Sequence, residues 1–286
     1  MLITPAPTEI STQRRTIWVN GRLLDRSEPA TVSVADHGLV VGDGVFEALK
    51  VTAAGPFAVA RHLDRLTRSA AAMGLPAPDH RELYAAIDAV TDRRDYEHGK
   101  IRITYTGGLG PLGSQAAYGT PTLVVIAEPV LLPPRATRVV TAPWTHNERG
   151  ALAGVKSTSY GENVRALAYA NAQDAGEAIF GNTVGHLCEG TGTNIFCVFG
   201  DRVVTPPLSA GPLAGITREL LLEWYEIEET DLRLDEAHTA DEVFLTSSLR
   251  DVQRVIGWDD RRYADHRVTD RLAAVFADRS GADLDP

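Results

Sequence analysis

The stretch PVLLPPRAT, residues 129–137, decides how this chain is organised. It places three prolines between two strand-like segments, PTLVVIAEP before it and RVVTAPW after it. Proline lacks a backbone N–H and restricts the residue before it, so clustered prolines favour a linker over a regular element. We therefore expect a small N-terminal domain over residues 1–128, a linker over 129–136 and a C-terminal domain over 137–286.

Both halves of the chain mix helices with hairpin-linked strands. In the N-terminal half, Asn20-Gly21 between apolar runs predicts a hairpin, and apolar spacing predicts a helix over residues 62–73. We expect a second helix over residues 80–92. The strand-like segments there are TVSVA, GVFEALKVT, IRITYT and PTLVVIAEP. In the C-terminal half, RVVTAPW, EAIFGN, TNIFCVF, RVVTP and DEVFLTS alternate irregularly with three helical stretches. The regular alternation of a doubly wound sheet is absent, so we predict the α+β class.

Composition excludes several classes of protein. The 286 residues carry 28 basic and 38 acidic side chains, and the net charge of −10 argues against a nucleic-acid partner and against docking on anionic lipid. No apolar run reaches the roughly 18 residues of a membrane-spanning helix. The first 15 residues predict a disordered tip without the features of a signal peptide. Two cysteines, Cys188 and Cys197, make no disulfide framework, so we expect a cytoplasmic protein.

Lysine is scarce in this chain, which makes each lysine informative. The three lysines are Lys50, Lys100 and Lys156. Lys156 lies in AGVKSTSYGEN, among small uncharged residues between a predicted strand and a predicted helix. A lysine amine becomes a nucleophile when burial or a neighbouring cation lowers its pKa. The alternative is an ordinary lysine with its amine in water.

Other residues could bind an anionic or aromatic ligand, and each has an ordinary alternative. Glu189, in HLCEGTGTNIF, could pair with a ring nitrogen or be a solvated turn residue. Gly215-Ile216-Thr217 could bind an anion at a helix start or simply cap the helix. Arg65 could clamp a phosphate or pair with Asp64 on the surface. Ser247 and Ser248 could reach a phosphate or form a turn. No histidine–cysteine cluster has metal-ligand spacing, and no dinucleotide or Walker motif occurs, so we predict no metal site.

The order of six segments is more specific than any one of them. VGDGVFEALKV, HLDRL, VKSTSYGENV, EGTGTNIF, LAGITRELL and DEVFLTSS together resemble the class IV pyridoxal-phosphate (PLP) enzymes. That family contains branched-chain aminotransferase, D-amino-acid aminotransferase and aminodeoxychorismate lyase. The resemblance runs from about Ile17 to Val255. It implies the two-domain fold type IV, with a smaller N-terminal α/β domain, a larger C-terminal mixed α/β domain and PLP at their interface.

The resemblance also implies the roles of individual residues. Lys156 matches the lysine that forms a Schiff base with PLP and then moves the proton between Cα and C4′. Glu189 matches the acid paired with the pyridine nitrogen, and Leu213 matches the leucine on the ring face. The positions that match phosphate-binding residues are Arg65, Ile216, Thr217 and Ser248.

Substrate-binding residues are expected on both domains. Phe46, with Glu47, matches the wall of the N-terminal domain that faces the cleft, and Leu249 is assigned to the same substrate side. Arg102, in KIRIT, matches the strand arginine of branched-chain aminotransferases, and we expect it, or Lys50, to hold a substrate carboxylate. The alternative for Arg102 is a strand-surface arginine. Lys100 and Val41 replace aromatic residues of that family, so the match to its substrate site is incomplete.

The resemblance implies a transaminase that moves an amino group between an amino acid and a 2-oxo acid. An aminodeoxychorismate lyase that releases 4-aminobenzoate and pyruvate is the alternative enzyme. A catalytically silent PLP-binding or ligand-sensing protein on the same fold is a third possibility, against which intact Lys156 and Glu189 argue. The family pattern implies a homodimer whose partners are small-molecule substrates.

Overall fold

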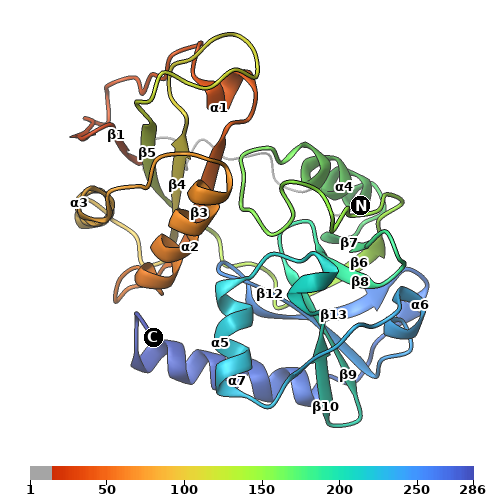
Figure 1. The fold of residues 1–286 in the computed structure, drawn as a ribbon. Helices are drawn as coiled ribbons and strands as arrows, with labels where there is room; N and C mark the ends of the chain where they lie inside the picture. Colours follow the sequence, from red (N-terminus) through yellow and green to blue (C-terminus); the bar gives the residue numbers. More distant parts are fainter. Residues whose placement is uncertain (1–14) are drawn as a thin grey trace. The chain divides into compact units, whose positions relative to one another are not determined.

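The computed structural model of the protein describes residues 15–286, which divide into two compact units (Figure 1). Unit 1 contains the described chain up to Leu132 together with Val155–Ser159 and Leu284–Pro286. Unit 2 contains Pro133–Gly154 and Tyr160–Asp283. Residues 1–14, on which the expected disordered tip falls, lie outside the described residues.

Unit 1 is built on an antiparallel five-stranded sheet in the order β2-β1-β5-β4-β3. Its strands are β1 (Thr16–Val19), β2 (Arg22–Leu23), β3 (Gly44–Val51), β4 (Gly99–Thr106) and β5 (Thr122–Pro129). Its helices are α1 (His37–Val40), α2 (Val59–Ala72) and α3 (His80–Asp92). α2 packs on β3 and α3 packs on β1 and β5, so a core of aliphatic side chains forms between the helices and the sheet.

The helices and strands predicted in unit 1 are confirmed with one exception. The Asn20-Gly21 turn joins β1 and β2, and both residues have positive φ angles of 44° and 82°, as this tight hairpin requires. The strand expected over residues 31–35 is wrong, because the chain there is loop and turn. Ser33 Oγ accepts the Ala35 N–H at 3.2 Å, and Asp36 caps α1. Such local side-chain bonds compete with strand pairing.

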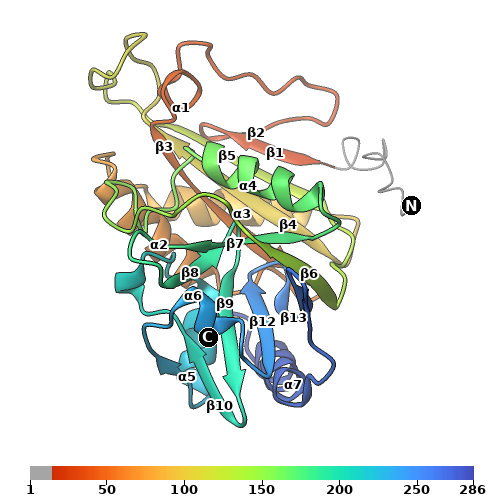
Figure 2. The same cartoon turned by 90° about the vertical axis from the view of Figure 1, so that its right-hand side faces the viewer.

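Unit 2 is built on a mixed nine-stranded sheet, seen from a second side in Figure 2. Its path is β11-β10-β9-β12-β13-β6-β7-β8, with β14 paired to β13. The strands are β6 (Ala136–Thr141), β7 (Glu177–Gly181), β8 (Leu187–Gly190), β9 (Asn194–Phe199), β10 (Arg202–Thr205), β11 (Glu228–Glu229), β12 (Glu242–Ser247), β13 (Asp251–Trp258) and β14 (Arg261–Arg262). The helices are α4 (Gly161–Asn171), α5 (Ile216–Trp224), α6 (Leu234–Ala237) and α7 (Arg267–Ala282), with a 3-10 turn at Leu208–Ala210.

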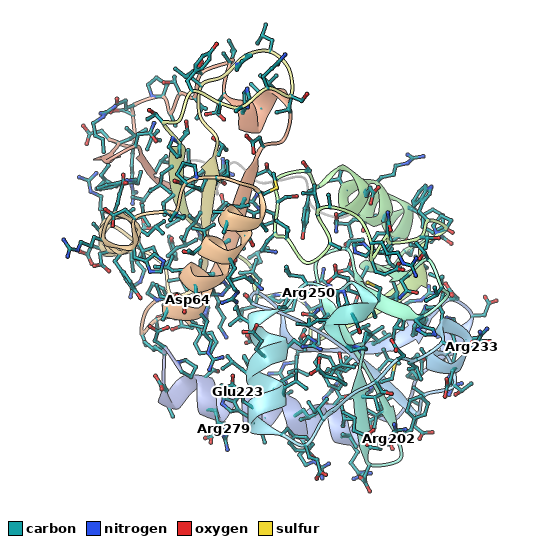
Figure 3. All side chains as sticks on the ribbon, in the orientation of Figure 1. Asp64, Arg202, Glu223, Arg233, Arg250 and Arg279 are labelled. Atoms are coloured by element: carbon teal, nitrogen blue, oxygen red, sulfur yellow. The ribbon has the colours of Figure 1, made fainter. Side chains whose placement is uncertain are left out.

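Buried apolar strands hold unit 2 together. β9 and β12 form antiparallel neighbours whose residues are almost all buried, and Phe196 stacks on Phe244 at 4.7 Å between ring centroids. Charged side chains such as Arg202 and Arg233 lie on the outside of the unit (Figure 3). Over residues 15–286, no helix combines the length and the apolar character needed to cross a membrane.

Candidate active site

Lys156 lies on a short segment that extends the edge of the unit 1 sheet. The Phe46 N–H donates to the Lys156 carbonyl at 2.9 Å, and the Thr158 N–H donates to the Gly44 carbonyl at 2.8 Å. Val45 and Ser157 form an antiparallel bridge between these two bonds. The segment is therefore fixed to β3 by hydrogen bonds on either side of Ser157, the first of them through the Lys156 carbonyl, although it is far from β3 in sequence.

The Phe46 ring lies close to two cationic groups. Lys156 Nζ is 4.4 Å from the ring centroid, and the Arg102 guanidinium carbon is 3.4 Å from it. Arg102 reaches this position from β4, where its Nε donates to Thr104 Oγ1 at 3.3 Å. The electron-rich ring face attracts cations. Unit 1 thus brings together three of the predicted residues, Phe46, Arg102 and Lys156.

Lys50 lies beside a different aromatic ring. It lies four residues further along β3, which corresponds to about 13 Å of extended strand. Its Nζ is instead 4.9 Å from the centroid of the Phe57 ring. Of the two residues expected to hold a substrate carboxylate, Arg102 contacts the same ring as Lys156, and Lys50 contacts the Phe57 ring.

Arg65 is buried and its partner is Glu47. Arg65 Nε and Nη2 donate to the two carboxylate oxygens of Glu47 at 2.8 and 2.6 Å. Asp64, the partner expected for a surface arginine, lies on the exposed face of α2 (Figure 3). Glu47 is fully buried against α2, which corrects the expectation that it lies beside Phe46 on a cleft wall. Neighbouring strand residues point to opposite faces of a sheet.

His62 completes this buried cluster. Its Nδ1 lies 2.7 Å from Glu47 Oε2, and a carboxylate only accepts hydrogen bonds, so Nδ1 carries a proton. Burial raises the pKa of Glu47, but the Arg65 charge and the hydrogen bonds from Arg65 and His62 outweigh it and hold the pKa well below its usual range. Burial lowers the pKa of His62, although the Glu47 contact opposes this shift. The cluster therefore contains a carboxylate, a guanidinium and an imidazole biased toward its neutral form.

Unit 2 brings Glu189 and Leu213 together. The Leu213 N–H donates to Glu189 Oε2 at 2.9 Å. Asn194, at the start of β9, donates its side-chain amide to the Leu213 carbonyl at 2.8 Å. In the antiparallel pairing of β9 with β12, Asn194 lies opposite Thr246. The Glu189 carboxylate and the loop that carries Leu213 are therefore tied to the middle of the unit 2 sheet.

α5 begins directly after this loop. Gly215 is its N-cap residue, and glycine offers no side-chain acceptor to the N–H groups of the first turn. Ile216 and Thr217 occupy the first two helical positions and are both buried. Ser248 and Leu249 lie in the turn between β12 and β13. The predicted residues thus fall into two groups, one in each unit.

The sequence model described as amino-transferase class IV matches residues 44–258. A putative branched-chain-amino-acid aminotransferase of Methanocaldococcus jannaschii is 34% identical, with 92% of this chain and 95% of that protein covered. A bifunctional aminodeoxychorismate lyase / D-amino acid transaminase of Mycobacterium tuberculosis is 29% identical, with 92% and 96% covered. The PLP-bound form of a hypothetical aminotransferase from M. tuberculosis superposes with a TM-score of 0.81 at 26% identity, covering 92% of this chain and 97% of that one.

The chain belongs to the class IV aminotransferase family. The family depends on PLP, and the fold is fold type IV, so the expected fold class and cofactor are confirmed. The two units also contain the types of group that PLP needs. Unit 1 offers the Lys156 amine, and unit 2 offers the Glu189 carboxylate and a glycine-capped helix start, a feature that binds phosphate.

Sequence reasoning assigned no role to three buried polar residues that the structure places in side-chain hydrogen-bond networks. Asn194 was read only as part of a strand, and His62 only as the start of a helix. Glu177, the first residue of β7, is fully buried. A charged residue opening an otherwise apolar strand is rarely buried without partners. The glutamate that opens the apolar segment EAIFGN was therefore a signal in the sequence for a buried, partnered carboxylate.

Proposed function

We propose that this protein is a PLP-dependent transaminase that moves an amino group from an amino acid to a 2-oxo acid, with Lys156 as the catalytic residue. The observation that carries the proposal is the position of Lys156. Its backbone is hydrogen-bonded to β3, its amine lies 4.4 Å from the centroid of the Phe46 ring, and the Arg102 guanidinium contacts the same ring. A substrate carboxylate held by Arg102 would therefore lie in the same part of unit 1 as this amine.

When bound, PLP supplies a protonated pyridine ring that stabilises negative charge at the substrate Cα. Lys156 would hold the cofactor through its amine, and the same amine would remove the Cα proton and return one. Glu189 would keep the proton on the ring nitrogen. The start of α5 with Thr217, together with Ser248 and Arg65, would bind the phosphate, and Leu213 would pack on the ring. Phe46, Arg102 and Leu249 would contact the substrate.

Borohydride trapping tests the assignment of Lys156. We expect reduction of the PLP-loaded enzyme to attach the cofactor covalently to the peptide that contains Lys156, as read by mass spectrometry. Lys156→Ala should abolish this labelling and lower the turnover of alanine with 2-oxoglutarate by several orders of magnitude. Lys100→Ala is the matched control, because the Lys100 amine on β4 is paired with the Glu128 carboxylate on β5, with 2.7 Å between Nζ and Oε1. Labelling of the native enzyme at another lysine would overturn the assignment.

The lyase remains a second candidate function because one relative carries both activities in its name. Glutamate formation from 2-oxoglutarate with either enantiomer of alanine, or with a branched amino acid, supports the transaminase. Release of pyruvate and 4-aminobenzoate from aminodeoxychorismate without an acceptor supports the lyase. An enzyme that holds PLP at Lys156 but performs neither reaction would contradict both functions and favour a silent binding protein.

We further propose that the protein is a cytoplasmic homodimer. Large apolar side chains are exposed on α1, on the turn before it and on the glycine-rich loop that follows β4, namely Val34, Leu39, Leu109, Leu112 and Tyr118. The two segments are joined, because Asp36 bridges to Leu109 and His37 Nε2 lies 2.8 Å from the Pro111 carbonyl. Exposed apolar surface of this kind favours association, here with a second copy. Light scattering should give twice the 30.9 kDa chain mass, and a monomer would contradict the proposal.

A further inference from the structure

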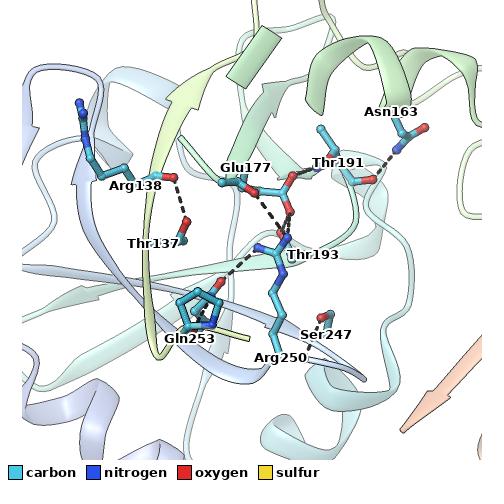
Figure 4. Close-up of polar contacts among 11 residues, drawn as sticks. Thr137, Arg138, Asn163, Glu177, Thr191, Thr193, Ser247, Arg250 and Gln253 are labelled. Atoms are coloured by element: carbon cyan, nitrogen blue, oxygen red, sulfur yellow. Dashed lines mark hydrogen bonds and ion pairs between the residues drawn. The ribbon is translucent and has the colours of Figure 1, made fainter. Parts of the chain in front are cut away.

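Glu177 is a fully buried carboxylate to which the proposed reaction assigns no role. It opens β7 in unit 2. An ionised carboxylate is expensive to bury unless several donors surround it. Glu177 Oε1 accepts the Thr191 N–H at 3.0 Å and also the Thr191 hydroxyl. Oε2 accepts the Thr193 hydroxyl at 3.3 Å and lies 3.3 Å from Arg250 Nη2 (Figure 4).

The threonine donors belong to the turn that directly follows Glu189. The Gly190 N–H donates to the Thr193 carbonyl at 2.8 Å, which closes the turn. A Cβ at Gly190 would lie 2.3 Å from Thr193 Oγ1 and 2.9 Å from Glu177 Cγ, so only glycine fits there. The turn is therefore packed directly around the Glu177 carboxylate.

Arg250 contacts the same carboxylate oxygen as Thr193 (Figure 4). Its Nη1 donates to Gln253 Oε1 at 3.1 Å and its Nη2 to the Gly176 carbonyl at 3.4 Å. The Arg250 N–H donates to the Ser247 carbonyl at 3.1 Å. Glu177 thus connects the turn after Glu189 to the turn between β12 and β13.

We propose that Glu177 is a positioning residue, which holds the Glu189 carboxylate in place for the pyridine nitrogen through the Thr191–Thr193 turn. The inference rests on the proposed function, since it assumes that Glu189 contacts the cofactor ring. Thr191, which Glu177 binds through both N–H and hydroxyl, is two residues from Glu189. A displacement of about 1 Å in a group of this kind is enough to lose much of its effect.

The decisive variant is Glu177→Gln, which keeps the side-chain volume but replaces one acceptor oxygen by an NH2 group. We expect the Kd of the apoenzyme for PLP, measured by absorbance titration, to rise at least tenfold. Far-UV circular dichroism should remain native. Glu242→Gln is the matched control, because Glu242 is also a buried carboxylate of unit 2 and binds the Val268 and Thr269 N–H groups at the start of α7. It should lower the unfolding temperature and leave the Kd within twofold of native.

A double-mutant cycle separates positioning from general loosening of the unit. If Glu177 acts through Glu189, then Glu177→Gln should change the Kd by less than about threefold when Glu189→Gln is already present. A penalty that stays tenfold or more in that background overturns the proposal. A native Kd for Glu177→Gln alone also overturns it.

Two further measurements keep the test decisive. Where Glu177→Gln fails to fold, Thr191→Val removes a single hydroxyl donor and should raise the Kd in the same direction, again only when Glu189 is intact. An unchanged Kd for Thr191→Val then contradicts the proposal. Failure of the proposed function is seen differently, as a native enzyme in which borohydride attaches no cofactor to Lys156.

Discussion

Glu47 in unit 1 and Glu177 in unit 2 are both fully buried carboxylates, yet their donors differ. Glu47 faces a guanidinium through two hydrogen bonds of 2.6 and 2.8 Å and an imidazole at 2.7 Å. Glu177 faces a backbone N–H and two hydroxyls, and its arginine is 3.3 Å away with a side chain that is 24% exposed.

The difference indicates what each carboxylate does for its unit. Opposite charges at hydrogen-bonding distance interact strongly in a buried site, so Glu47 principally fixes the position and charge of Arg65. A carboxylate interacts less strongly with neutral donors than with a cation. The neutral donors to Glu177 all come from the backbone and side chains of one turn, so Glu177 principally fixes the shape of that turn. One unit uses its carboxylate to hold a cation and the other to hold a loop.

The largest effect is expected when each carboxylate is replaced by its amide. Glu47→Gln leaves the buried Arg65 charge without its counter-ion, and breaking a buried pair in this way costs about 3–5 kcal/mol. Glu177→Gln loses hydrogen bonds to neutral donors, for which about 1–3 kcal/mol is typical. Urea unfolding of the two apoenzyme variants beside the native protein measures both free energies.

The order of these two effects tests the comparison directly. A Glu177→Gln variant that is destabilised as much as Glu47→Gln would mean that the Arg250 contact, and not the threonine donors, dominates in unit 2. Arg250→Gln is the control, because on our interpretation it removes a solvent-accessible charge and should be milder than either change.

The sequence predicted the helices and strands better than it predicted the hydrogen-bond partners of Glu47 and Glu177. The helix over residues 80–92 has apolar residues at helical spacing and the strand EAIFGN has a short apolar run, and both are confirmed as α3 and β7. β13, Asp251–Trp258, was missed although it lies inside the unit 2 sheet between β12 and β6. Its apolar residues do not alternate cleanly, and its glycine is a poor strand former, so its pairing depends on neighbours distant in sequence.

In the candidate site, too, the contacts that the sequence did not predict join residues distant in sequence. The order of motifs selected Lys156, Glu189 and the start of α5 as candidates, because each motif is local. The partner of Arg65 is eighteen residues away in sequence, and the nearer Asp64 was the obvious alternative. Whether a helix residue faces a strand or the solvent is decided by packing, and packing places Arg65 inside and Asp64 outside.

The titration of His62 should have an intermediate effect on the free energy of unfolding. Burial lowers the pKa of His62, so the folded protein binds a proton there less readily than the unfolded chain does. The unfolded histidine titrates near 6.5, and stability should therefore be lost as the pH falls below that value. One proton contributes at most about 1.4 kcal/mol per pH unit.

His62→Gln isolates this contribution, because glutamine can still donate to Glu47 but does not titrate. The free energies of unfolding of the native protein and the variant should run parallel above pH 7. Below pH 6.5 the native protein should lose stability more steeply than the variant. Parallel curves down to pH 5 would show that His62 accepts its proton in the folded state, which contradicts an imidazole held neutral beside Glu47.

In each unit a carboxylate that is distant in sequence caps the start of a helix. We expect the loss of the exposed cap in unit 1 to have the smallest effect on stability. In unit 1, Asp285 accepts the Ala60 N–H at 2.9 Å in the first turn of α2, the helix that carries His62 and Arg65. The α2 N-cap residue, Ala58, has no side-chain cap of its own. In unit 2, buried Glu242 accepts two N–H groups and the Thr269 hydroxyl at the start of α7.

Asp285→Ala removes one exposed cap and should destabilise the protein by about 1 kcal/mol, as N-cap deletions typically do. Asp285→Asn, which keeps an acceptor oxygen, should recover most of that loss. Glu242→Ala should cost more, because it leaves buried N–H groups unsatisfied. Urea unfolding of the three variants gives the ranking. Equal losses for Asp285→Ala and Glu242→Ala would mean that the Asp285 cap is as important to unit 1 as a buried carboxylate is to unit 2, and that α2 depends on the last residues of the chain.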